Sequence, residues 1–99
     1  MNKVLKIALD YDETFTSDRS FWRNFVILSK ISNHQIVFVT YRTNREVDNN
    51  SDIESDAITC GINVIYSQGQ PKRTVFDADI WIDDSPETIV ELDDVCFLL

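Results

Sequence analysis

Residues 4–14 have the sequence VLKIALDYDET, in which the apolar run Val4–Leu9 is followed at once by the carboxylates of Asp10 and Asp12. The run predicts a buried β-strand, and the two acids stand at its carboxyl end. In an extended segment, residues i and i+2 project to the same side, so both carboxylates would face one ligand. Because two negative charges at one place repel each other, the pair indicates a bound cation and predicts metal-assisted chemistry.

The composition is that of one globular domain. The chain has 99 residues, of which 43% are hydrophobic, with only two glycines and two prolines, and we expect residues 1–99 to form a single domain. No apolar run is long enough to cross a bilayer, and the start of the chain lacks the pattern of a signal peptide, so we expect a cytoplasmic protein with no membrane partner. The net charge of −8 disfavours a nucleic-acid partner, although it does not exclude a phosphorylated substrate.

Short apolar runs recur along the whole chain, and each predicts a strand that is buried on both faces. These runs are Val4–Leu9, Ile36–Val39, Ile62–Tyr66, Ile80–Ile82 and Val95–Leu99. Helices are expected between them, near residues 19–31, 52–60, 71–77 and 86–92. Alternation of this kind implies an α/β fold with a parallel sheet and helices on both faces. Ligands of such sheets bind beyond the carboxyl ends of the strands.

Local signals support the first two helices. Apolar residues fall at helical spacing after the capping candidates Ser17 and Asp18, and we interpret this stripe as core. Its members are Phe21, Trp22, Phe25, Leu28 and Ile31. The segment Ser51–Glu54 has the form of a capping box, and Gly61 stands where a helix end favours a left-handed residue.

Polar residues follow each of the first four expected strands. Thr40 ends the second, Lys72 lies in the connection after the third, and Asp83 and Asp84 follow the fourth. Carboxylate oxygens favour Mg²⁺, which commonly binds together with a substrate phosphate. Phosphoryl transfer is therefore the chemistry indicated. In it Asp10 would attack phosphorus, Thr40 would donate to a phosphoryl oxygen, Lys72 would offset the repulsion between anions, and Asp12 would transfer protons.

These residues, in this order, resemble the haloacid dehalogenase superfamily. Its first motif, Asp-x-Asp-x-Thr, looks like Asp10–Thr14; its second, an apolar strand ending in Thr or Ser, looks like Ile36–Thr40. Lys72 is the match for the lysine of the third motif, and Asp83-Asp84 is the match for the acidic pair of the fourth. The resemblance implies a Rossmann-like sheet of five strands in the order 5-4-1-2-3.

The same resemblance implies a set of functional residues. Mg²⁺ would be held by the Asp10 side chain, the Asp12 backbone carbonyl and an acid of the fourth motif. Because the Ile-Asp-Asp-Ser-Pro form is similar to that of deoxyribonucleotidases and carboxy-terminal-domain phosphatases, Asp84 is favoured over Asp83. An Asp at position 12 looks like the phosphatase branch of the family. Thr14, Tyr41 and Arg42 are the candidate substrate residues.

The chain departs from the family pattern in two ways. Glu13 stands where many members have glycine, and no segment is long enough to form a cap domain. An open site either accepts large substrates or takes a lid from another subunit, for which a homodimer would suffice. A small phosphorylated substrate, with nucleotides slightly ahead, is the expectation, while nucleic-acid ends and phosphoproteins are the alternatives.

Three other interpretations remain. A phospho-receiver domain combines similar residues, but its phosphorylated Asp follows the third strand, where this chain has Tyr66-Ser67. A second interpretation keeps the fold as a binding or regulatory module without turnover. In the third, the acids at the strand ends merely cap helices and keep a small domain in solution.

Overall fold

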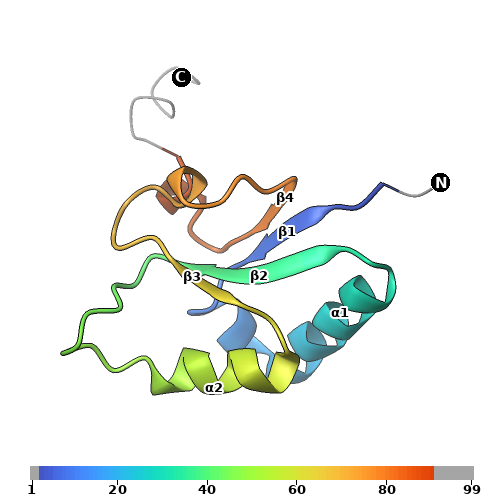
Figure 1. The fold of residues 1–99 in the computed structure, drawn as a ribbon, viewed down its shortest axis with the longest axis horizontal. Coiled ribbons are helices and arrows are strands. Elements are labelled where there is room, and N and C mark those ends of the chain that lie inside the picture. The colour runs from blue at the N-terminus through green and yellow to red at the C-terminus, as the bar shows by residue number, and fades with distance from the viewer. Residues whose placement is uncertain (1–2, 91–99) are drawn as a thin grey trace.

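The centre of the fold is a parallel sheet of four strands in the order β3-β2-β1-β4. The computed structural model describes residues 3–90. The strands are β1 (Lys6–Leu9), β2 (Gln35–Thr40), β3 (Val64–Tyr66) and β4 (Ile80–Ile82). Ala8 lies opposite Val37 on one side and Trp81 on the other, so β1 is a central strand (Figure 1). The expected parallel α/β sheet is confirmed with four strands instead of five, and the expected fifth, Val95–Leu99, lies outside the described residues.

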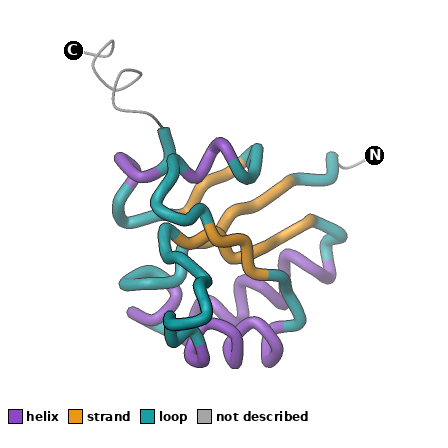
Figure 2. The backbone as a smooth tube through the Cα atoms, turned by 60° about the vertical axis from the view of Figure 1, so that its left-hand side comes forward, coloured by secondary structure: helices purple, strands orange, loops and turns teal. Residues whose placement is uncertain are grey.

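The two α-helices cover one face of the sheet. These are α1 (Arg19–Ile31) and α2 (Ser51–Cys60), which lie beside each other below the strands in Figure 1 and along the same side of the tube in Figure 2. Val26 of α1 and Ile53 of α2 join Leu9 and Phe38 of the sheet in one buried cluster. The expectation of helices on both faces is wrong for the described part of the chain.

The opposite face is covered by short turns and their connections. The helices expected near residues 71–77 and 86–92 are single 3₁₀ turns over Lys72–Thr74 and Pro86–Thr88, and residues 91–92 lie outside the described part. The connection after β3 must cross the sheet to reach β4 beyond β1. An extended chain spans more than twice the distance per residue that a helix spans. Because this connection must cross the sheet, few of its residues remain for a helix, and only a short turn is helical.

Two of the three predicted helix-end signals are confirmed, namely the N-cap of α1 and the glycine that ends α2. Asp18 caps α1, where its side chain accepts a hydrogen bond from the Phe21 N–H at 3.1 Å. Gly61 ends α2 with a φ of 68°, the left-handed conformation that glycine adopts readily. The capping box is wrong, however, because Ser51 lies inside the helix and the N-cap is Asn50, whose side chain makes no capping hydrogen bond.

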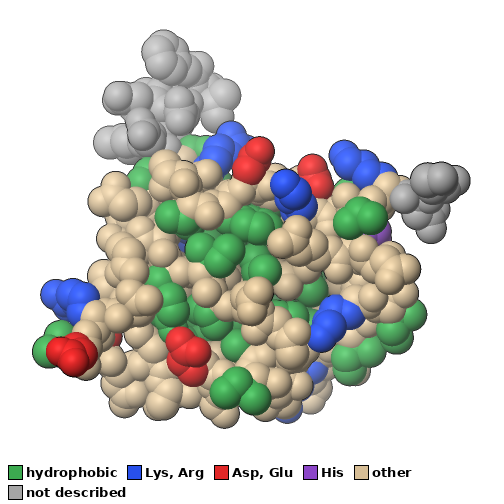
Figure 3. Space-filling view, in the orientation of Figure 1, with side chains coloured by type: hydrophobic (Ala, Val, Ile, Leu, Met, Phe, Trp, Pro, Cys, Tyr) green, Lys and Arg blue, Asp and Glu red, His purple; other side chains and the backbone are tan. Residues whose placement is uncertain are grey.

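Helix α1 buries a narrower stripe than its sequence predicts. Val26 is fully buried and Trp22 packs against the core, but Phe21, Leu28 and Ile31 are 57%, 63% and 71% exposed. Figure 3 shows hydrophobic side chains at the surface where this helix lies. The assignment of these three residues to the core is therefore wrong, since the helix meets the sheet along one narrow line only. Within residues 3–90, neither helix has the length and apolar character that a membrane crossing requires.

Candidate functional site

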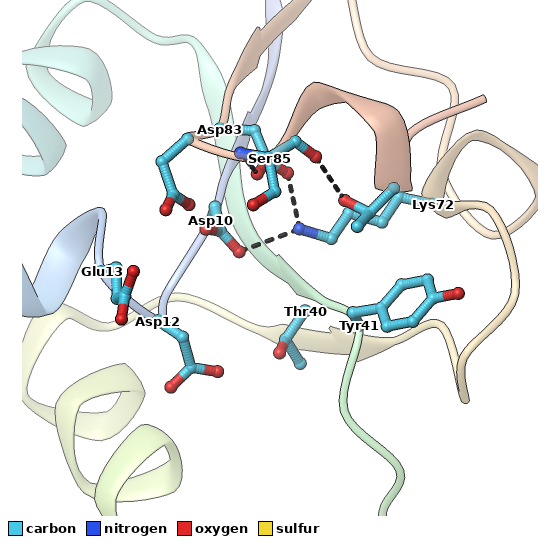
Figure 4. A pocket seen from close by; sticks show the side chains of 10 residues that line it. Asp10, Asp12, Glu13, Thr40, Tyr41, Lys72, Asp83 and Ser85 are labelled. Carbon is cyan, nitrogen blue, oxygen red and sulfur yellow. Dashed lines mark hydrogen bonds and ion pairs between the residues drawn. The ribbon is translucent and has the colours of Figure 1, made fainter. Parts of the chain in front are cut away.

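The carboxyl ends of the strands surround a pocket of about 200 Å³. It lies where the chain order reverses, between β1 and β4, which is where ligands of open α/β sheets bind. The lining residues, shown as sticks in Figure 4, are Asp10, Asp12, Glu13, Thr40, Tyr41, Lys72, Asp83, Asp84, Ser85 and Thr88. All four residues predicted to be catalytic and all four predicted to bind metal are among them. Two predicted substrate residues, Thr14 and Arg42, lie beside the pocket instead.

Lys72 is the buried cation at the centre of the site. Its side chain is 2% exposed, and Nζ donates to Asp10 Oδ1 at 2.8 Å and to Asp83 Oδ2 at 2.5 Å. The 3₁₀ turn after β3 carries this lysine beneath the pocket, while the Asp10 N–H donates to the Ile82 carbonyl at 2.9 Å and so extends the pairing of β1 with β4. Figure 4 shows the ammonium between the two carboxylates.

Burial dominates the electrostatics of Asp10. It raises the pKa of this carboxyl to about 6, against the hydrogen bond from Lys72, which lowers it. Asp84 behaves in the opposite way, because a hydrogen bond with Asp10 holds the pKa of Asp84 below its usual value. A proton taken up by this pair therefore resides first on Asp10.

Three aspartates form a candidate metal centre. Carboxylate oxygens of Asp10, Asp83 and Asp84 all lie within 4.8 Å of one another. Lys72 supplies one positive charge for three carboxylates, so the group has a surplus of negative charge, with Asp10 buried and Asp84 exposed to solvent. All the donors are hard oxygens, and this donor set fits Mg²⁺.

The two acids after β4 differ in how they are held. Asp83 accepts hydrogen bonds from Lys72 and from the Ser85 N–H, the latter at 2.9 Å. Asp84 lies 3.2 Å from the Thr14 hydroxyl, which is also 3.1 Å from Asp10 Oδ2. One hydroxyl proton serves only one acceptor at a time. Asp84 therefore has the more available oxygens, and the preference for it over Asp83 as a metal ligand stays a prediction.

Asp12 is held by an arginine outside the pocket lining. Arg42 donates to both Asp12 oxygens, at 2.9 and 2.6 Å, and to both oxygens of Asp52, at 2.8 and 2.9 Å. These bonds, first from Asp52 and then from Asp12, raise the pKa of Arg42, while Arg42 lowers the pKa of Asp52 to about 2. The guanidinium is thus already engaged by carboxylates and lies 5.3 Å from the centre of the Tyr11 ring.

The remaining predicted residues flank the centre. Thr40 is buried, and its hydroxyl oxygen accepts from the Arg42 N–H at 3.3 Å, which leaves the hydroxyl proton for a ligand. Glu13 has a φ of 62°, and its N–H donates to the Thr16 hydroxyl at 2.9 Å. The turn after β1 is therefore made with a glutamate in the left-handed region, which glycine adopts more readily.

Sequence reasoning missed a buried network behind the site. The Tyr11 hydroxyl donates to Asp56 Oδ2 at 2.5 Å, and Asp56 also accepts from Arg19 and Arg23, each at 3.2 Å. The network ties the residue between the two site aspartates to both helices. Its signal was available: a tyrosine between two outward acids must point inward, where its hydroxyl needs a partner.

No protein-family model, no curated protein and no solved structure matches this chain. The function must therefore be argued from the fold and from the side chains of the site.

Proposed function

We propose that the chain is a Mg²⁺-dependent phosphomonoester hydrolase of the haloacid dehalogenase type, with Asp10 as nucleophile. One observation carries this proposal: buried Lys72 bridges Asp10 and Asp83 beside Asp84, at the sheet edge where the chain order reverses. The side chains of Lys72, Asp10 and Asp83 come from three separate segments of the chain, and such charges are costly to bury for structural purposes alone. They match what a phosphate dianion and a divalent cation need.

The first step forms an aspartyl phosphate. A carboxylate oxygen of Asp10 attacks phosphorus, and the bond from phosphorus to the ester oxygen breaks with its electron pair on that oxygen. Asp12 gives the departing oxygen a proton. Lys72 and the Thr40 hydroxyl stabilise the charge on the transferring phosphoryl oxygens.

The second step releases phosphate. Asp12, now a carboxylate, takes a proton from water, and the oxygen of that water attacks phosphorus. The bond to Asp10 breaks and regenerates its carboxylate, and Asp12 ends the cycle protonated. Mg²⁺ would be held by Asp10 and Asp84, with Asp83 nearby, and would supply positive charge that keeps Asp10 ionised and draws the phosphate dianion in.

The accessibility of the two aspartates fits this division of work. Asp10 is buried beneath the phosphate position, as a nucleophile with one fixed target should be. The Asp12 side chain is 52% exposed, so it can leave Arg42 and turn toward an ester oxygen. The described residues include no cap over the pocket, and the substrate enters from solvent.

The test is phosphate release from p-nitrophenyl phosphate by the wild-type chain with Mg²⁺ and with EDTA, beside Asp10→Asn. Asp77→Asn is the matched control, because this exposed acid lies outside the pocket. We expect turnover that needs Mg²⁺, survives in Asp77→Asn and is lost in Asp10→Asn. Release in Asp10→Asn equal to wild type, or none from any variant, would refute the hydrolase proposal.

A second candidate is a module that binds phosphate or phosphorylated ligands without turnover. The two-bond pairing of Asp12 with Arg42 favours it, because a carboxylate held in this way is withheld from proton transfer. Calorimetry with a non-hydrolysable phosphonate separates the two. Mg²⁺-dependent binding without phosphate release would support the module.

A further inference from the structure

Tyr41 is an exposed aromatic residue at the mouth of the pocket. Its side chain directly follows Thr40, and the residue is 47% exposed. In Figure 4 the ring extends from beside Thr40, with its hydroxyl directed away from Asp10. Leaving a large ring in water gives up the free energy that its burial would contribute. Other apolar residues of the chain are exposed as well, but Tyr41 is the large apolar one among the pocket-lining residues and can therefore contact a bound ligand.

Hydrogen bonds fix the main chain from which this ring projects. Beyond the ends of β2 and β3, hydrogen bonds continue from the Ser67, Gly69 and Gln68 N–H groups to the carbonyls of Thr40, Tyr41 and Arg42, at 2.8, 3.0 and 3.2 Å. A main chain held by such a ladder loses little further freedom when a ligand binds. The position of Tyr41 at the pocket is therefore fixed before binding, and only its side-chain torsions remain to be ordered.

The pocket is too small to hold a whole substrate of ordinary size. Its volume is about 200 Å³, whereas pockets that enclose drug-sized ligands measure about 300–1,000 Å³. The phosphoryl group fills the part near Asp10 and Lys72, so the rest of the ester lies at the mouth. There it meets the residues of the rim.

The rim has an acidic side and an uncharged side. Asp12 and Glu13 lie together on the first, opposite Tyr41 (Figure 4), and the exposed Asp84 is a further acid of the lining, while Ser85 and Thr88 are uncharged. The nearby guanidinium of Arg42 is already paired with two carboxylates. A leaving group that carries further negative charge is disfavoured at such a rim, and an uncharged one is accepted.

We propose that Tyr41 is a stacking platform for a flat, uncharged aromatic ring in the leaving group of the substrate. The inference rests on the proposed function and adds the substrate class. The ring is a nucleobase or a simple aryl group, since both present a π-face of suitable size. Polynucleotide ends and acidic phosphopeptides, which bring neighbouring charges to the rim, are poor substrates by the same reasoning.

The experiment compares esters that differ in the ring alone. Benzyl phosphate and cyclohexylmethyl phosphate share a leaving-group type, and adenosine 5′-monophosphate and ribose 5-phosphate differ by the base. We expect wild-type kcat/KM to favour the aromatic member by about three- to tenfold, the usual worth of one aromatic pair. Tyr41→Ala removes this ratio, Tyr41→Phe keeps it, and the control Ile58→Ala, an 80% exposed apolar residue on α2, leaves it unchanged.

The outcomes are separable from those of the proposed function. If the ratio of kcat/KM between the aromatic and the non-aromatic ester is the same in wild type and Tyr41→Ala, for both pairs of esters, the proposed stacking role of Tyr41 is wrong. A preference within the benzyl pair alone identifies aryl esters as the substrate class, and a preference within the nucleotide pair alone identifies nucleotides. If no ester is hydrolysed, the affinities of benzylphosphonate and cyclohexylmethylphosphonate in Mg²⁺ decide. A Tyr41-dependent preference then supports the platform in a binding protein, and equal affinities overturn it.

Discussion

Replacing Lys72 by Met tests the buried ion pairs most directly. Methionine keeps most of the volume of the side chain but removes the charge that lies 2.8 Å from Asp10 and 2.5 Å from Asp83. Removal of one partner from a buried ion pair costs about 3–5 kcal/mol, because the other charge is left without compensation. The cost of an unpaired buried charge arises mainly at Asp83, because burial already raises the pKa of Asp10 to about 6 and a proton can neutralise Asp10.

The expected loss is large for a chain of this size. A domain of 99 residues has a free energy of unfolding of roughly 5–15 kcal/mol, so a loss of about 3–5 kcal/mol in Lys72→Met removes roughly a fifth of it or more. Urea unfolding near pH 7.5 in EDTA, followed by tryptophan fluorescence, measures the loss. The exposed neighbour Arg73, changed to Met, is the control and should shift the free energy of unfolding by less than about 0.5 kcal/mol.

A double variant makes the reasoning refutable. If uncompensated charge is the cause, Lys72→Met with Asp83→Asn is more stable than Lys72→Met alone by at least about 1 kcal/mol, although it carries one change more. A loss under about 1 kcal/mol in Lys72→Met, or a double variant no more stable than the single one, would show that the Lys72 contacts do not bear this energy.

Three further predictions concern the neighbouring residues. Asp56→Asn lowers the free energy of unfolding by about 1–3 kcal/mol at pH 7. Burial acts to raise the pKa of Asp56, but hydrogen bonds from Tyr11, Arg19 and Arg23 outweigh burial and lower that pKa. Wild type therefore loses stability as the pH falls below about 4, where Asp56 takes up a proton. Urea unfolding at pH 7, 4 and 3 should show that the free energy of unfolding depends less on pH in the variant than in wild type. Glu13→Gly relieves the left-handed φ of 62° and raises the free energy of unfolding by about 0.5–1 kcal/mol, whereas Glu13→Ala, measured in the same thermal melts, does not. Mg²⁺ at ten times its Kd stabilises wild type by about 1.4 kcal/mol, and an unchanged Tm, or an equal rise in Asp84→Asn, would contradict the metal site.

The site could be located from sequence because it depends on strand ends. The runs before Asp10, Thr40 and Asp83 are strongly apolar, and their strands lie side by side and parallel, so their carboxyl ends meet at one edge of the sheet. The same rule predicts that Lys72 lies at this edge, because the connection after β3 also starts there. The pattern of apolar runs therefore predicts which residues lie at this edge of the sheet.

The ion-pair partners of the site residues and the burial of the helix residues could not be predicted in the same way. Whether Arg42 would contact a substrate or Asp12 depends on the path of residues 41–50, which no periodic pattern specifies. The apolar stripe of α1 has helical spacing, but spacing alone does not say how wide a contact the sheet offers, and Leu28 and Ile31 remain exposed. The turn around Lys72 likewise depends on the distance that its connection must cross.

The two site aspartates differ most in the cations that hold them. Lys72 is enclosed between Asp10 and Asp83, so Asp10 cannot move away without leaving buried charges unpaired. Arg42 is held by Asp52 as well as by Asp12 and lies partly in solvent, so Asp12 can leave while the guanidinium keeps a carboxylate partner. Movement is therefore less costly for Asp12 than for Asp10, although Asp12 must first give up two hydrogen bonds from Arg42. The proposed two-step phosphoryl transfer would use this difference, with Asp10 as a fixed nucleophile and Asp12 as a movable proton carrier.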